Sequence, residues 1–101
     1  MLLFQSGVCC HLLRHEMSLV LHTASAWAAI AGLIVVVVAL DESDEGPAPA
    51  QAVDLVIDLP DASDQAVQAA ALCAYLARTL GVGYWVTVDD GGIHVQYAPP
   101  V

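Results

Sequence analysis

The longest apolar stretch in the chain runs from Met17 to Leu40 and contains no charged residue. Only His22 and scattered hydroxyl groups interrupt it, so a helix over this range would be apolar on all sides. At roughly 1.5 Å per residue this helix would be about 36 Å long, which is enough to span a hydrocarbon core of about 30 Å. The pattern predicts one transmembrane helix over 17–40, because the rest of the chain offers too small a partner for a buried core helix of this length.

The processing and the start of this segment remain open at the level of sequence. Val37 and Ala39 form a small-residue pattern that is typical of a signal-peptide cleavage site. We favour a retained signal-anchor, because the apolar stretch exceeds the usual h-region of about 7–15 residues and the segment before it is hardly basic. Arg14 favours a cytoplasmic N-terminus and a C-terminal domain outside. Residues 1–16 are interpreted as an N-terminal extension, and if Met17 is the true start of translation they do not belong to the working protein.

After the apolar stretch the pattern of apolar and polar residues changes twice. Residues 41–52 (DESDEGPAPAQA) combine clustered acids with glycine and proline, a composition that predicts a stiff, extended acidic spacer. From Val53 to Leu59 apolar residues occupy every second position, which predicts a half-buried strand. Cleavage at a second small-residue pattern, around Ala50 and Ala52, is an alternative end for a signal peptide.

A helix over about 62–80 follows that strand. Pro60 stops the strand, and Asp61 or Ser63 can accept hydrogen bonds from the first free N–H groups of the helix. Gly81 supplies the C-terminal stop. One stripe of the helix is apolar at three- and four-residue spacing, and it consists of Ala69, Leu72, Cys73, Leu76 and Leu80.

The last two periodic segments, GYWVTV and IHVQYA, are separated by DDGG and predict a β-hairpin with Asp90 and Gly91 in the turn. Pairing Val88 with Ile93 puts the helix-facing side chains on one face, and these are Tyr84, Val86, Val88, Ile93, Val95 and Tyr97. It leaves Trp85, Thr87, His94 and Gln96 on the other face, whereas a slip by one residue would bury His94 and Gln96. The predicted fold class is therefore α+β: one N-terminal transmembrane helix followed by a βαββ domain over 53–101, with three strands packed on one helix in an unspecified order.

Composition narrows the range of partners. The chain has eleven acids, two arginines and no lysine, and residues 41–101 carry the whole net charge of −9. This balance argues against nucleic acid as a partner, because binding phosphates needs clustered bases. The lack of lysine and the bias to Asp, Ala and Val are typical of a halophile or a GC-rich genome.

Motifs for catalysis or cofactor binding are missing from the sequence, so we expect neither enzymatic activity nor a cofactor. The nearest approach to a metal site is CCHLLRH, with Cys9, Cys10, His11 and His15 as candidate ligands. Adjacent cysteines rarely bind one ion together, and the second ligand pair of a zinc module is absent, so we expect no bound metal. His22 lies near one end of the apolar stretch and is expected at the membrane interface.

Two groups of residues are candidates for contact with other molecules. Ala24, Ala28 and Gly32 form a row of small residues that would let another membrane helix approach closely. A second group, predicted to share the solvent face of the sheet and to bind a protein partner, consists of Asp54, Asp58, Trp85, Thr87, His94 and Gln96. The alternative for this face is a solvated surface with one aromatic residue.

The sequence thus favours a membrane-anchored, non-enzymatic interaction or assembly subunit, whose acidic domain docks a protein partner or a second copy. A three-stranded sheet with exposed edges is marginal alone, which also favours membership of an assembly. One alternative is a small pore-forming or lysis-type phage protein assembled through its helix. The other is a secreted binding module released by cleavage near Ala39.

Overall fold

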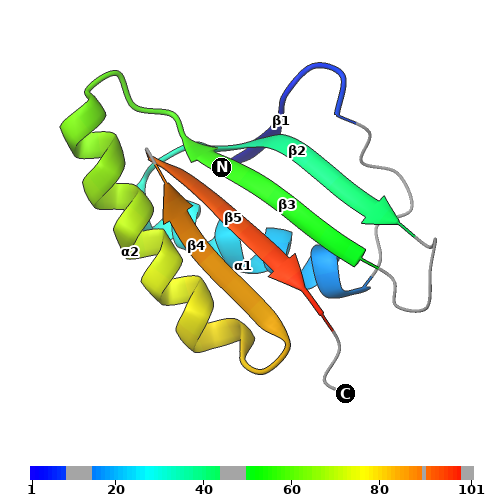
Figure 1. Cartoon of the computed structure of the whole chain (residues 1–101). Coiled ribbons are helices and arrows are strands. Elements are labelled where there is room, and N and C mark those ends of the chain that lie inside the picture. The colour runs from blue at the N-terminus through cyan, green and yellow to red at the C-terminus, as the bar shows by residue number, and fades with distance from the viewer. Residues whose placement is uncertain (9–14, 44–49, 90, 99–101) are drawn as a thin grey trace.

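The structure is a computed structural model and describes residues 1–8, 15–43, 50–89 and 91–98 (Figure 1). Within these ranges the chain forms two helices and five strands. In chain order they are β1 (Leu2–Phe4), α1 (His15–Ala31), β2 (Val35–Ser43), β3 (Ala50–Ile57), α2 (Ala62–Leu80), β4 (Tyr84–Asp89) and β5 (Gly92–Tyr97).

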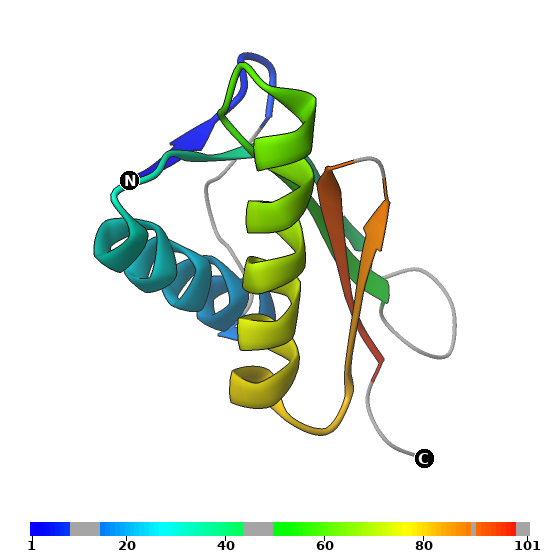
Figure 2. The ribbon, with the colours of Figure 1, turned by 90° about the vertical axis from the view of Figure 1, so that its left-hand side faces the viewer.

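All five strands belong to one mixed sheet with the order β1-β2-β3-β5-β4. β1 runs parallel to β2, and the other neighbouring pairs are antiparallel. Helix α1 connects β1 to β2, and α2 connects β3 to β4. Strand β5 lies between β3 and β4 in the sheet. Both helices pack against the same face of the sheet (Figure 2). The opposite face is not covered by either helix.

The structure contradicts the predicted transmembrane helix over 17–40. Helix α1 ends at Ala31, Gly32 adopts a φ of +72°, and the following valines begin strand β2. Valine's branched Cβ favours a pleated strand, and glycine reaches a positive φ at little cost, so this stretch divides into a helix and a strand. In the described ranges, no helix combines the length and the apolar character that crossing a bilayer requires. The membrane, signal-anchor and single-pass localisation predictions were therefore wrong.

The predicted fold class was wrong in its strand number as well, because the sheet has five strands rather than three. Residues 2–4, which we assigned to an N-terminal extension, form β1. The predicted spacer overlaps two strands, since β2 continues to Ser43 and β3 begins at Ala50. Ala39, the position of the alternative cleavage site, lies inside β2 and pairs with Asp54.

The structure confirms the helix and the hairpin register that were predicted in the second half of the chain. Helix α2 runs from Ala62 to Leu80, and the Asp61 side chain accepts hydrogen bonds from two backbone N–H groups of its first turn. Strands β4 and β5 pair in the predicted register, with Val88 opposite Ile93. Gly91 has a φ of +79°, as the tight turn requires, while Asp90 lies outside the described residues. These elements form part of the larger sheet.

The hydrophobic core lies between the helices and the covered face of the sheet. Strand positions point alternately toward the helices and away from them, so every second residue of β3 from Gln51 to Ile57 is buried. The same alternation buries Val35 and Val37 of β2 and Ile93 and Val95 of β5. The Tyr84 hydroxyl donates to the Glu16 carbonyl at 3.4 Å and joins β4 to the start of α1. The buried apolar side chains are Met17, Val20, Leu21, Ala24, Ala28, Val35, Val37, Val53, Leu55, Ile57, Ala69, Leu72, Leu76, Leu80, Ile93 and Val95.

One titratable group in this packing gives a testable pH dependence. The Cys73 thiol lies 3.8 Å from the Val86 carbonyl, and burial raises the pKa of this thiol from its ordinary value of 9.0. Above about pH 9 the unfolded chain loses this proton more readily than the folded one, so stability falls as pH rises. Burial also raises the pKa of Tyr84, helped by Glu16 and Tyr97, and this acts in the same direction above pH 10.

We therefore expect the free energy of unfolding to fall between pH 8 and pH 10, and to fall less in Cys73→Ala. Urea denaturation at both pH values, with reductant present, measures the two decreases. Tyr84, Cys9 and Cys10 are present in both the unaltered protein and the variant, so their contributions to the pH dependence cancel in the comparison. An identical decrease in the variant would mean that Cys73 does not carry the effect.

Candidate functional site

The uncovered side of the sheet carries most of the residues that the sequence nominated for partner binding. The pairing registers align them in rows across three strands, with Thr87 beside His94 and His94 beside Asp54. Trp85 pairs with Gln96 in the next row. We call this surface the open face; its side chains include Val36, Val38, Asp41, Asp54, Val56, Trp85, Thr87, Asp89, His94 and Gln96.

Asp54 and His94 form a hydrogen-bonded pair at the centre of the open face. Nδ1 of His94 lies 2.6 Å from Oδ1 of Asp54, and the two side chains are 43% and 46% exposed. An ionised carboxylate only accepts hydrogen bonds, so Nδ1 is the donor and Nε2 stays available to a ligand. Such an exposed pair adds only about 0–1 kcal/mol to stability, so its main effect is to fix the orientation of the imidazole.

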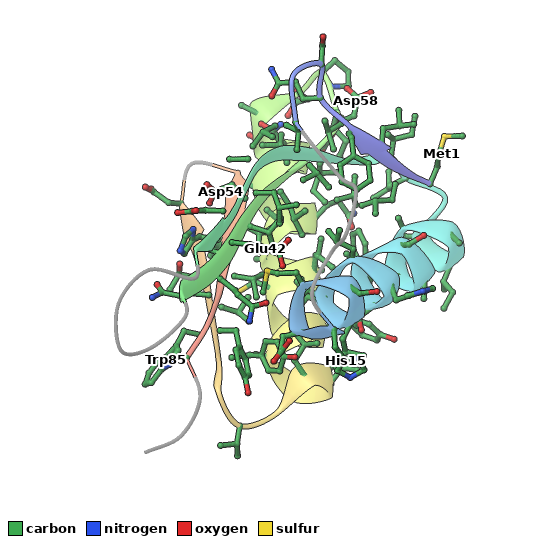
Figure 3. All side chains as sticks on the ribbon, turned by 90° about the vertical axis from the view of Figure 1, so that its right-hand side faces the viewer. Met1, His15, Glu42, Asp54, Asp58 and Trp85 are labelled. Carbon is green, nitrogen blue, oxygen red and sulfur yellow. The ribbon has the colours of Figure 1, made fainter. Side chains whose placement is uncertain are left out.

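Trp85 is the largest exposed aromatic residue on this surface, with 67% of its area accessible. Figure 3 shows it projecting from β4 on the side of the sheet away from α1. Its neighbours Tyr84 and Val86 point to the opposite face and pack against the core. The alternation along β4 therefore fixes the indole on the open face.

A depression of about 340 Å³ lies beside the Asp54–His94 pair. Gly92 occupies its floor, where the absence of a side chain leaves a gap between Asp89 on β4 and Val56 on β3. Val38 forms part of the wall because the register of β2 shifts between Val37 and Ala39, which leaves Val38 as an extra residue at the bulge. The depression thus combines aliphatic walls with carboxylate groups.

Two other hollows lie beside the helices. One, of about 230 Å³, is lined by Leu2, Phe4, Ser18, Leu21, His22 and Ser25; the other, of about 520 Å³, is lined by Ala62, Gln65, Ala66, Ala70, Val88 and Gly91. Neither lining includes a carboxylate. Of the three hollows, the one on the open face offers both charge and apolar surface.

The charge on the open face is acidic. Asp41, Asp54 and Asp89 carry it, and within the described ranges this face holds no lysine or arginine. Arg78, on α2, is the single described residue of either type. The face therefore presents negative charge around an exposed tryptophan and half-buried valine side chains.

Some nominated residues lie elsewhere. Asp58 follows the end of β3, where its N–H donates to the Ile34 carbonyl, so it does not join the central group. Ala24 and Ala28 are completely buried in the core, and Gly32 is exposed in the turn after α1. The three therefore do not form a continuous exposed row; contact with another helix stays an untested prediction.

The suggested metal ligands are only partly described. Cys9, Cys10 and His11 lie outside the described residues, and His15 is exposed at the start of α1. Among the residues that the structure describes, no group of three or more histidine, cysteine or acidic side chains is placed to hold a metal ion. His22 is also exposed on α1, beside the hollow next to β1.

Comparison with known proteins finds no family model, curated protein or solved structure that matches this chain.

Sequence reasoning missed three residues of the open face that shape the depression. Val38 was assigned to a membrane helix, Gly92 was read only as part of a turn, and Asp89 was not assigned to a face. The alternation along β4 was sufficient to place Asp89 beside Thr87 and Trp85. The position of Val38 depends on a β-bulge, for which the sequence gives no clear sign.

Proposed function

We propose that the protein is an interaction module whose open face docks a protein partner with a basic and partly apolar surface. The observation that carries the proposal is the exposed Trp85 on a helix-free sheet face. Large aromatic side chains supply much of the binding energy in protein interfaces, and tryptophan is enriched at such positions. A sheet also holds these side chains in fixed positions, which lowers the entropic cost of binding.

Charge favours a basic partner. The open face holds three aspartates and no described lysine or arginine, and the whole chain carries a net charge of −9. Complementary charge on the partner would speed association and select against acidic proteins. The Asp54–His94 pair adds a fixed polar group beside the apolar surface. Together these features support recognition of lysine- or arginine-containing segments.

Selection from a displayed library of random peptides tests this proposal. We expect the enriched peptides to be basic and to contain apolar residues, and to bind Trp85→Ala at least about 30-fold more weakly, as loss of an interface hot spot of about 2 kcal/mol implies. Fluorescence anisotropy with a labelled enriched peptide measures the change. Binding should also weaken as salt is raised.

Val67→Ala is the matched control, because Val67 is 64% exposed on α2 and lies off the open face. This variant should bind the peptide like the unaltered protein. Enrichment of acidic peptides, or equal binding by Trp85→Ala, would contradict the proposed function.

A further inference from the structure

We infer that the depression above Gly92 is a receptor for a single basic side chain, lysine or arginine, of the docked partner. This inference rests on the proposed function, because it names the chemical group that the open face recognises. The size of the depression fits the assignment. About 340 Å³ is near the lower end of the range of small-molecule pockets, roughly 300–1,000 Å³, so it suits one extended side chain.

The walls and the polar groups match the two parts of such a side chain. Val38 and Val56 offer aliphatic surface to the methylene stem of a lysine or arginine. Asp89 and Asp54 line the same depression and offer carboxylate oxygens to the charged head. An apolar ligand would leave these carboxylates without a charged partner, and an anionic ligand would be repelled.

His94 limits where the charged head can bind. Its Nδ1 holds Oδ1 of Asp54 at 2.6 Å, so the other oxygen of Asp54 and the carboxylate of Asp89 are the groups left for a ligand. Asp54 and Asp89 together place two carboxylates at the depression. The incoming cation supplies the compensating charge that no described lysine or arginine of this face provides.

Gly92 keeps the space empty. A Cβ atom built at this position would stand 3.3 Å from the Asp89 carbonyl and 3.7 Å from the Leu55 carbonyl. The backbone of Gly92 does not have a positive φ, so alanine is compatible with its conformation, and the Asp89 carbonyl must move slightly to admit the methyl group. Gly92→Ala therefore fills part of the floor.

Side-chain fragments test the inference without the partner. We expect n-butylammonium and n-propylguanidinium to shift the amide NMR signals of Gly92, Asp89 and His94 in the full chain, and 1-butanol to leave them unchanged. Asp89→Asn should weaken fragment binding about two- to fivefold, which is the range for one exposed ion pair. Gly92→Ala should weaken it as well.

Asp41→Asn is the matched control, since Asp41 lies on the same face but does not line the depression. It should bind the fragments like the unaltered protein. Absence of fragment-induced shifts, or equal shifts with 1-butanol, would overturn the inference. The proposed function fails separately, by the peptide selection and Trp85→Ala, so the two results distinguish the hypotheses.

Discussion

Replacing Ala28 with glutamate is expected to destabilise the protein by at least about 3 kcal/mol, the usual minimum for an unpaired charge in a core. The Ala28 side chain is completely buried on α1 and belongs to the hydrophobic core, so a carboxylate there would lose its hydration without gaining a charged partner. A domain of this size is typically stable by only about 5–15 kcal/mol, so the loss is a large fraction of the total. Urea denaturation followed by circular dichroism measures it.

The neighbouring Ala29 provides the control, because its side chain is exposed on the same helix. Ala29→Glu should change the free energy of unfolding by no more than about 0.5 kcal/mol. In a membrane-spanning helix, both substitutions would place an acid in the apolar segment and both would be costly. Equal damage from the two variants would therefore contradict the arrangement of α1 described above.

Leu55→Ala should destabilise the protein by about 2–5 kcal/mol, because Leu55 is fully buried on β3 and its removal leaves a cavity beneath the helices. The residue after it, Val56, faces the open side of the same strand and is only partly buried. We expect Val56→Ala to cost less than about 1 kcal/mol. Thermal and urea denaturation of the two variants compare the two faces of one strand directly.

This pair of variants tests whether the helices cover only one face of the sheet. If both variants lost similar stability, then side chains on both faces of β3 would be buried. The open face would in that case be covered in solution by another protein or by a second copy of this chain. If neither lost stability, the core assignment for β3 would be wrong.

The second half of the fold was readable from the sequence because each element has a distinct local signal. Asp61 and Gly81 cap the two ends of α2, and the alternation of apolar residues identifies β3, β4 and β5. The hairpin register followed from burial alone, since a slip by one residue would exchange the faces of β5. The same alternation placed Asp54, Trp85 and His94 on one surface, although their role in binding stays a prediction.

The secondary structure of the first half could not be predicted correctly, because its almost uniformly apolar composition conceals the change from helical to strand periodicity. In residues 17–40 nearly every position is apolar, so neither a helical nor a strand period stands out. We expected that so long a segment would need a partner from elsewhere in the chain. That partner exists: α1 packs mainly against α2, and the segment divides at Gly32, after which β2 joins the sheet.

Errors in the first half also limited the prediction of the candidate site. With β2 assigned to a membrane helix, neither Val36 nor Val38 was available to border the open face. The depression depends on a bulge in β2 and on a missing side chain at Gly92, and both are visible only when the pairing is known. The sequence thus located the polar residues of the surface and missed its shape.

The insertion of β5 between β3 and β4 has a consequence for the growing polypeptide. Strand β4 is synthesised before β5, yet it reaches the rest of the sheet only through β5. A nascent chain that has emerged as far as Asp89 therefore carries an apolar strand without a pairing partner, and one side of β3 is also unpaired. Strand β5 must therefore leave the ribosome before the sheet can close, and until then the emerging chain exposes strand edges of the kind that chaperones recognise.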